Sequence, residues 1–162
     1  MSHIEQISLA YLTRKFKLMI DAPPEAVWPH MLDFEKFNQT FERVEVLSGE
    51  RNCVGTVSRL IKEEGEWYMP PYLVKIIELV PNEKIVWKMF PDQGDSFFGF
   101  VEFSLTEVEG KTEFYNGVYF EYLLPKMADD AIAEFEEKIQ HDYAILEKKI
   151  FNKLKELSEG NT

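Results

Sequence analysis

A long amphipathic segment at the C-terminus constrains the fold of this chain more than any other feature. Its apolar side chains fall within about 40° of one line on a helix that turns ~100° per residue. They are Ala128, Ile132, Phe135, Ile139, Tyr143, Leu146, Ile150 and Leu157. Pro125 precedes the segment and Gly160 follows it, as is typical of helix ends. We therefore predict one helix over residues 126–157, with an apolar face that must be buried.

The chain before this helix is dominated by strand patterns. Phe16, Leu18 and Ile20 alternate with Lys15 and Lys17, which is the period of a strand with one buried face. Further strands are predicted over 43–47, 55–62, 67–79, 84–89, 97–106 and 112–122. Short polar turns join most of them, and such short connections favour antiparallel neighbours. The proline pair at 70–71 would force an edge position or a bulge on its strand.

Three short helices are also predicted. One begins at the proline pair 23–24 and contains Val27 and Trp28, and Pro29 within it requires the helix to be short or bent. A second short helix or turn covers residues 33–37. Residues 3–11, within an N-terminal extension over 1–12, are predicted to form another helix, which carries Ile4, Ile7, Leu9 and Tyr11.

These elements predict an α+β fold in one domain over residues 1–162. The chain has no repeat, low-complexity tract or linker, and its length suits one domain with a sizeable core. Nothing else is helical on the scale of the C-terminal segment, so the partner of that helix must be the sheet. A curved antiparallel sheet of about seven strands, crossed by one long helix, buries both apolar faces.

Charge and cysteine content exclude several functional classes. The net charge is −11, with 18 basic and 29 acidic residues, which argues against nucleic acid and against an anionic membrane surface. No run approaches the roughly 20 apolar residues of a membrane span. Cys53 is the only cysteine, so an intrachain disulfide is excluded, and a lone thiol suits the reducing cytoplasm. We expect a cytoplasmic protein without a metal or cofactor.

The opening of the chain resembles a known superfamily. Residues 20–28 read IDAPPEAVW and residues 32–37 read LDFEKF, with looser echoes at 54–57, 78–81 and 110–112. This pattern is similar to the START/birch-pollen-allergen (SRPBCC) superfamily, and most similar to its polyketide cyclase/dehydratase and lipid-transport-like branch. The resemblance covers about residues 14–157. It implies a helix-grip fold with an apolar cavity between sheet and helix that holds a hydrophobic small molecule.

The alternation of the strands indicates which side chains would line such a cavity. With Lys75, Lys88 and Glu113 outward, the inward set is mostly apolar and also includes Ile76, Ile85, Phe97, Gly99 and Phe120. The predicted ligand-binding residues are Tyr72, Val74, Trp87, Met89, Val101, Phe103, Phe114, Asn116 and Val118 on the strands, and Phe135, Ile139 and Tyr143 on the helix. The alternative is a solid core, since this pattern does not distinguish packed from hollow.

Polar residues in the inward set are the most informative, because burial requires a partner. Asn116 could orient a ligand carbonyl or hydroxyl, or bond instead to a neighbouring group. Tyr143 would place a phenol on the inner side of the helix. Arg59 shares parity with Val57 and Ile61, so it is predicted at the cavity mouth, where it could pair with a ligand carboxylate. The alternative for Arg59 is a rim position with its charge in water.

Catalytic signatures are weak. The chain has no nucleophile elbow, phosphate-binding glycine loop or HExxH motif, and its three histidines lie far apart. His141 falls ~200° from the apolar line of the helix, which predicts a surface position. Three functions remain open: binding or transport of a lipid or aromatic metabolite, a cyclase/dehydratase-like enzyme, and a protein-interaction module like the heat-shock ATPase activators. We favour the first; a homodimer stays open.

Overall fold

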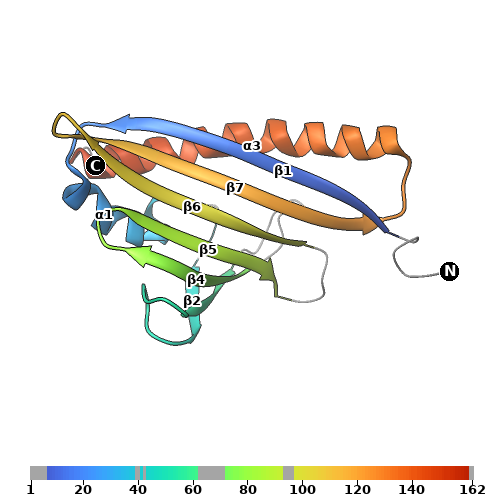
Figure 1. The fold of residues 1–162 in the computed structure, drawn as a ribbon, viewed down its shortest axis with the longest axis horizontal. Coiled ribbons are helices and arrows are strands. Elements are labelled where there is room, and N and C mark those ends of the chain that lie inside the picture. The colour runs from blue at the N-terminus through green and yellow to red at the C-terminus, as the bar shows by residue number, and fades with distance from the viewer. Residues whose placement is uncertain (1–6, 39–40, 42, 62–71, 93–96, 161–162) are drawn as a thin grey trace.

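A seven-stranded antiparallel sheet and three helices make up the fold, which a computed structural model describes over residues 7–38, 41, 43–61, 72–92 and 97–160. In chain order the elements are β1 (Ile7–Ile20), α1 (Pro24–Leu32), α2 (Phe34–Phe37), β2 (Arg43–Ser48), β3 (Val57–Ile61), β4 (Tyr72–Val80), β5 (Lys84–Pro91), β6 (Phe97–Val108), β7 (Lys111–Pro125) and α3 (Asp129–Ser158). The predicted α+β helix-grip architecture is confirmed (Figure 1).

The sheet is a meander whose first strand closes it from the opposite side. The strand order is β1-β7-β6-β5-β4-β3-β2, so β1 pairs with the last strand and not with the next one. The partners of β1 run from Ile7 opposite Pro125 to Ile20 opposite Thr112. The predicted bulge or edge at the proline pair 70–71 lies outside the described residues.

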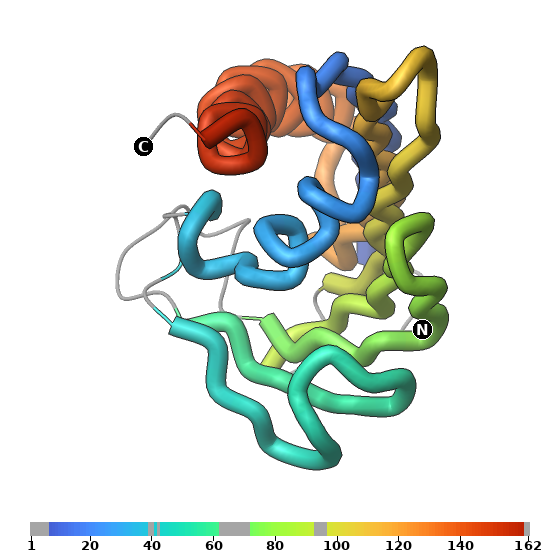
Figure 2. The backbone as a smooth tube through the Cα atoms, turned by 90° about the vertical axis from the view of Figure 1, so that its left-hand side faces the viewer, coloured from blue at the N-terminus to red at the C-terminus, as the bar shows by residue number. Residues whose placement is uncertain are grey.

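All three helices lie on the concave side of the sheet (Figures 1 and 2). Helix α1 is nine residues long with Pro29 inside it, and it buries Val27, Trp28 and Met31. Helix α3 is 30 residues long and buries Ile139, Ile150, Phe151 and Leu154. None of the described helices therefore covers the opposite, outer face of the sheet.

The N-terminal prediction was wrong for the part that the structure describes. Residues 7–11 belong to β1 and are not helical, and the predicted extension over 1–12 ends inside this strand. Ser8, Ala10 and Leu12 are buried while Leu9 and Tyr11 are exposed, which continues the period-two pattern of the later part of β1. Pairing with β7 over 14 positions decides the conformation.

Side chains of α3, together with that of Glu159 directly after it, cover the backbone of β1 and of the next residue, Asp21, at the edge of the sheet. The N–H groups of Tyr11 and Asp21 donate to Glu136 Oε2 at 2.8 Å and to Glu159 Oε2 at 2.7 Å. The carbonyls of Thr13 and Met19 accept from Gln140 Nε2 at 3.4 Å and from Lys155 Nζ at 3.0 Å. An uncovered edge presents free N–H and C=O groups to other chains. The long helix thus fastens itself along the strand whose edge it covers.

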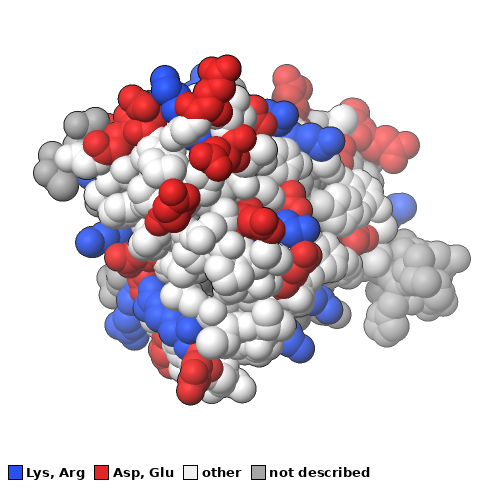
Figure 3. All heavy atoms as spheres, turned by 60° about the vertical axis from the view of Figure 1, so that its left-hand side comes forward, with Lys and Arg blue, Asp and Glu red and all other residues white. Residues whose placement is uncertain are grey.

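The molecular surface mixes charges of both signs. On the face seen in Figure 3, acidic side chains are spread among basic and uncharged ones. The first turns of α3 carry Asp129, Asp130, Glu134 and Glu137, all exposed. Among the described helices, none is long and apolar enough to cross a membrane.

Candidate functional site: an aromatic cavity between sheet and helix

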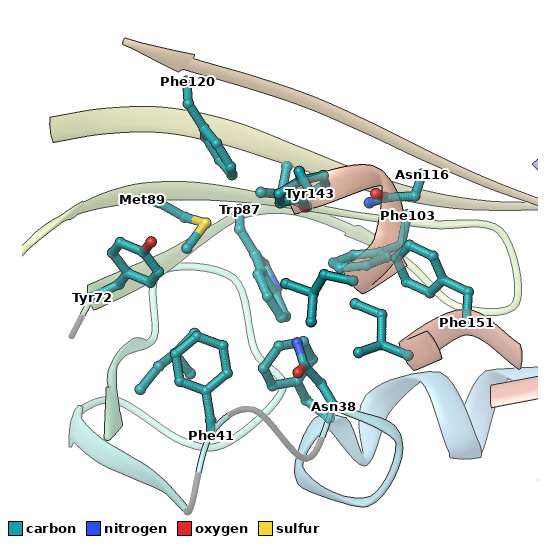
Figure 4. A pocket seen from close by; sticks show the side chains of 15 residues that line it. Asn38, Phe41, Tyr72, Trp87, Met89, Phe103, Asn116, Phe120, Tyr143 and Phe151 are labelled. Carbon is teal, nitrogen blue, oxygen red and sulfur yellow. The ribbon is translucent and has the colours of Figure 1, made fainter. Parts of the chain in front are cut away.

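An apolar cavity of about 50 Å³ lies between the sheet, α2 and α3 (Figure 4). This volume would hold roughly three to five water molecules. The lining residues are Phe34, Asn38, Phe41, Leu60, Tyr72, Trp87, Met89, Val101, Phe103, Asn116, Phe120, Tyr143, Leu146, Ile150 and Phe151. Aromatic rings therefore fill most of the space between the two layers and leave a small hollow at their centre.

Ring contacts fix the walls of this cavity. Trp87 lies edge-on to Phe34 and to Phe103, with both pairs of ring centroids 4.9 Å apart. Phe151 of α3 lies 4.8 Å from Phe114 and 5.2 Å from Phe16. The two Phe151 pairs are tilted, and the two Trp87 pairs are edge-to-face contacts that contribute about 0.5–1.5 kcal/mol each beyond their buried area. The walls are held by several such pairs at once, which favours one defined shape.

Asn116 on β7 is the buried amide of the site. Its residue is 2% exposed, and its Nδ2 donates to the backbone carbonyl of Glu102 at 3.0 Å. The sequence left open that Asn116 bonds to a neighbouring group instead of a ligand. The nitrogen of its side-chain amide does make such a bond. The side-chain oxygen makes no hydrogen bond within the described part of the chain, and it retains its capacity to accept one.

Tyr143 on α3 supplies a phenol to the same cavity. Its ring meets Phe120 edge-on with the centroids 5.9 Å apart. Burial, with the negative charge of Glu147 one turn along the helix, raises the pKa of the Tyr143 phenol above its ordinary value, while Arg14 opposes the shift. The group consequently stays protonated and acts toward the cavity as a neutral hydrogen-bond donor.

A partly buried ion pair between Arg14 and Glu147 lies close to Tyr143, and the sequence analysis missed it. Arg14 Nε donates to Glu147 Oε1 at 3.0 Å and Arg14 Nη1 donates to Gln140 Oε1 at 2.9 Å. The Glu147 side chain is 3% exposed, and its Oε2 has no hydrogen-bond partner among the described residues. Two signals were available in the sequence: Arg14 shares the parity of Phe16 and Leu18, and Glu147 interrupts the apolar face of the helix.

The structure brings seven of the predicted site residues together around this cavity. They are Tyr72, Trp87, Met89, Val101, Phe103, Asn116 and Tyr143. Phe114, Val118, Phe135 and Ile139 point into the core but do not line the cavity. Phe114 packs on Phe151, and Phe135 packs on Tyr122 with the ring centroids 5.5 Å apart. Whether any of these residues contacts a ligand stays a prediction.

Arg59 is not at the cavity, and its predicted orientation was wrong. Leu60 is buried in the cavity wall, so alternation along β3 turns Arg59 to the outer face. There Arg59 Nε donates to Asp92 Oδ2 at 2.8 Å, and Glu45 Oε1 lies 3.4 Å from its Nη1. The strand is short and has apolar residues on both faces. The prediction assumed that Val57 and Ile61 point inward, whereas Leu60 does.

A second cavity of about 40 Å³ lies beside the first, toward β2 and β4. Val74, a predicted site residue, lines it together with Ile76 and Ile85 from the sheet. Phe34, Leu60 and Trp87 line both cavities and form the wall between them. The contribution of α2 and the following residues, through Phe34, Asn38 and Phe41, was also missed, because its distance from the sheet depends on the packing of the whole domain.

The described residues contain no cluster of metal-binding side chains. No three His, Cys, Asp or Glu side chains among residues 7–38, 41, 43–61, 72–92 and 97–160 lie together as a metal site would require. His141 is exposed on α3, 3.3 Å from Asp142, as its helical position predicted. The polar side chains that line the main cavity are the amides of Asn38 and Asn116, the phenols of Tyr72 and Tyr143 and the indole of Trp87, and all are uncharged or stay neutral.

The curved sheet closed by one long helix over an apolar cavity defines a member of the START/SRPBCC superfamily. A family model described as Activator of Hsp90 ATPase homolog 1-like protein matches residues 21–140. This span is more than half of the chain, so the chain belongs to that family. The comparison with curated protein sequences gave no match.

Several solved structures share the fold at low sequence identity. The Zhui aromatase/cyclase from a Streptomyces species has a TM-score of 0.68 at 16% identity, covering 92% of this chain and 94% of that one. Ara h 8.0201 has a TM-score of 0.65 at 13% identity, covering 94% and 100%. The Aha1 dimer from Colwellia psychrerythraea has a TM-score of 0.56 at 17% identity, covering 93% and 98%. Likeness at this level shows the fold alone.

Proposed function

We propose that this protein binds a hydrophobic small molecule, a lipid or an aromatic metabolite, in the cavity between the sheet and α3. The observation that carries the proposal is a cavity walled by aromatic side chains in which Asn116 and Tyr143 retain hydrogen-bonding capacity. Ligand sites typically combine apolar walls with a few polar groups that fix orientation. Asn116 would accept from a ligand hydroxyl, and Tyr143 would donate to the same or a neighbouring oxygen.

The charge state of the cavity narrows the ligand class. Its polar lining consists of uncharged amides, phenols and the Trp87 indole, and the raised pKa of Tyr143 keeps that phenol neutral. Arg14, whose positive charge acts on Tyr143, is engaged by Glu147 and Gln140. An ionised ligand group would lose its hydration here without gaining a counter-ion. The buried end of the ligand is therefore uncharged and carries a hydroxyl or carbonyl oxygen.

The small volume of the cavity requires its walls to move before a ring can enter. A volume of about 50 Å³ is smaller than the roughly 150 Å³ of an engineered cavity that binds benzene. A ligand with one or two rings enters only if wall side chains change rotamer. Met89, which is unbranched and lines the cavity, is the side chain best suited to move.

Two measurements test the proposal. Native mass spectrometry of protein purified from its own host should show a retained apolar molecule. Calorimetric titration with 2-naphthol should show saturable binding, and Tyr143→Phe should weaken it about tenfold, because one hydrogen bond to an otherwise unpaired phenol is lost. Tyr115→Phe, on the outer face of β7, serves as the matched control and should bind as the wild type does. No retained molecule and no binding of 2-naphthol would contradict the proposal.

A second candidate is activation of a heat-shock ATPase through protein contacts, and the match to the activator family favours it. The measurement is the ATP turnover of Hsp90 with and without this chain. Tyr143→Phe separates the two candidates, because an activity of the protein surface is indifferent to a hydroxyl inside the cavity. A turnover that this chain does not change removes the second candidate.

A further inference from the structure

The second cavity differs from the main cavity in the charge of its lining. Most of its walls are aliphatic or aromatic, but Arg51, Asn52 and Ser58 also line it. The main cavity has no charged side chain in its lining. Arg51 therefore sets the second cavity apart as a place where a negatively charged ligand group can meet a cation.

The hairpin of β2 and β3 supplies these three polar residues, and it lies on the side of α1 and α2 away from α3 (Figure 2). Its turn, which carries Arg51 and Asn52, is fastened to β4. Gly55 N–H donates to the Ile76 carbonyl at 2.7 Å, and Ile76 N–H donates to the Thr56 carbonyl at 3.1 Å. The backbone that carries the two polar side chains is thus held in place by the sheet.

Ser58 brings a hydroxyl to the inner face of the sheet. It lies opposite Val74 in the register of β3 and β4, and it shares the parity of the buried Leu60. Neither the Ser58 hydroxyl nor the Asn52 amide makes a hydrogen bond to another group within the described part of the chain. Both residues are partly exposed, so they retain donors for a ligand.

Arg51 is joined to α2 by an ion pair. Its Nη2 donates to Glu35 Oε2, while its Nε and Nη1 make no hydrogen bond among the described residues. A guanidinium shared by two carboxylates already occurs in this chain, where Arg59 holds Asp92 and Glu45 together. Arg51 accordingly has donors left for a ligand carboxylate, which would share the guanidinium with Glu35.

We propose that the second cavity binds a short-chain carboxylic acid, with the carboxylate on Arg51, Asn52 and Ser58 and the alkyl chain among the apolar walls. An ionised carboxylate only accepts hydrogen bonds, and all three side chains can donate them. At roughly 10–15 Å³ for each water-sized atom, a volume of about 40 Å³ admits about three or four carbon atoms. Pentanoate, with four carbons beyond its carboxylate, matches this space without moving the wall toward the main cavity.

Binding here is independent of the main cavity and is expected to be weak. The two cavities differ in the charge that they accept, so the titrations with 2-naphthol and with pentanoate succeed or fail separately. Glu35 pairs with Arg51, and Asp33 adds a second negative charge that acts on it. Both oppose a ligand anion, so we expect a Kd on the order of 1 mM.

Titration of the isotopically labelled chain with pentanoate, at constant ionic strength and followed by two-dimensional NMR, tests the proposal. Backbone amide signals of residues 51–58 should shift and saturate. Arg51→Gln should weaken binding at least about tenfold, because its charge-assisted hydrogen bonds are lost. Arg59→Gln is the matched control, since it removes an arginine from the outer face of the same hairpin, and it should bind as the wild type does. Pentanamide, which keeps the carbonyl and lacks the charge, should bind the wild type at least about tenfold more weakly than pentanoate.

Glu35→Gln supplies a test in the opposite direction. Loss of the carboxylate that shares Arg51 should tighten pentanoate binding by about threefold or more, because one negative charge beside the ligand is removed. An affinity that Glu35→Gln leaves unchanged or lowers overturns the role of Arg51 as the counter-ion. The proposal is also overturned if the signals of residues 51–58 do not respond to pentanoate, or if Arg51→Gln binds it as tightly as the wild type. Equal binding of pentanamide and pentanoate overturns it too, since charge then plays no part.

Discussion

At the scale of single residues, the Tyr143 phenol combines burial with a nearby negative charge. Because both raise its pKa, the folded chain holds this proton more tightly than the unfolded chain. The stabilisation from this group is complete below the ordinary tyrosine pKa of about 10 and is lost as the pH rises above it. In an alkaline titration followed by phenolate absorbance, Tyr143→Phe should remove the latest component. An unchanged late component would show that the phenol is not sequestered.

Gly99 is a residue at which packing forbids any side chain. A Cβ built there would lie 2.3 Å from the Tyr119 carbonyl oxygen and 2.4 Å from Cδ1 of Phe120, a cavity-lining ring. Strand and ring would both have to shift, so Gly99→Ala should lower the free energy of unfolding by about 1–3 kcal/mol. Chemical denaturation measures this loss. Thr106→Ala, at an exposed position of the same strand, is the control and should change stability by less than about 0.5 kcal/mol.

At the scale of elements, α3 and β1 form one unit. Glu136, Gln140, Lys155 and Glu159 reach the backbone of the strand, and the Arg14–Glu147 pair joins the two elements from inside. These contacts are spread over the length of the helix. The cavity therefore lies under a helix that is fixed along one edge of the sheet.

Glu159 gives this unit a dependence on pH. Its hydrogen bond from Lys155, with that from the Asp21 N–H, lowers the pKa of the carboxyl. A lowered folded pKa means that the stabilisation is present above the ordinary glutamate value and is lost as the pH falls through the lowered one. The wild type should lose more unfolding free energy than Glu159→Gln between about pH 6 and pH 3. If the wild type and Glu159→Gln lost the same unfolding free energy over this pH range, the hydrogen bonds of Glu159 would contribute nothing to stability.

The alternation of apolar and polar side chains along the strands made much of this architecture predictable. The predictions failed mainly for charged residues. Trp87, Met89 and Phe103 face inward as their parity requires, because a slip of one residue would turn a whole apolar set to solvent. Arg59 was misplaced because its strand is apolar at both parities. Arg14 and Glu147 were not recognised as an interior pair, although each occupies an apolar position in its element. Their pairing depends on how helix and strand meet, which a pattern within one element does not contain.

At the scale of the whole molecule, the interior is divided and nearly full. Cavities of about 50 and about 40 Å³ lie on either side of the wall formed by Phe34, Leu60 and Trp87. Neither alone is large enough for an aromatic ring. The proposed binding would thus depend on three side chains that come from α2, β3 and β5, because a ligand longer than one ring would have to displace them.

Leu60→Ala removes the smallest part of that wall and should join the two cavities. The truncation should cost about 2–5 kcal/mol of unfolding free energy, as for any buried leucine. The joined space approaches the roughly 150 Å³ that accepts benzene, and a ligand that binds only the folded state raises its stability. Benzene should therefore raise the melting temperature of Leu60→Ala and leave that of Leu154→Ala nearly unchanged, since Leu154 is equally buried but lines neither cavity. Equal shifts in the two variants would mean that Leu60 does not separate the cavities and that the interior behaves as one packed core.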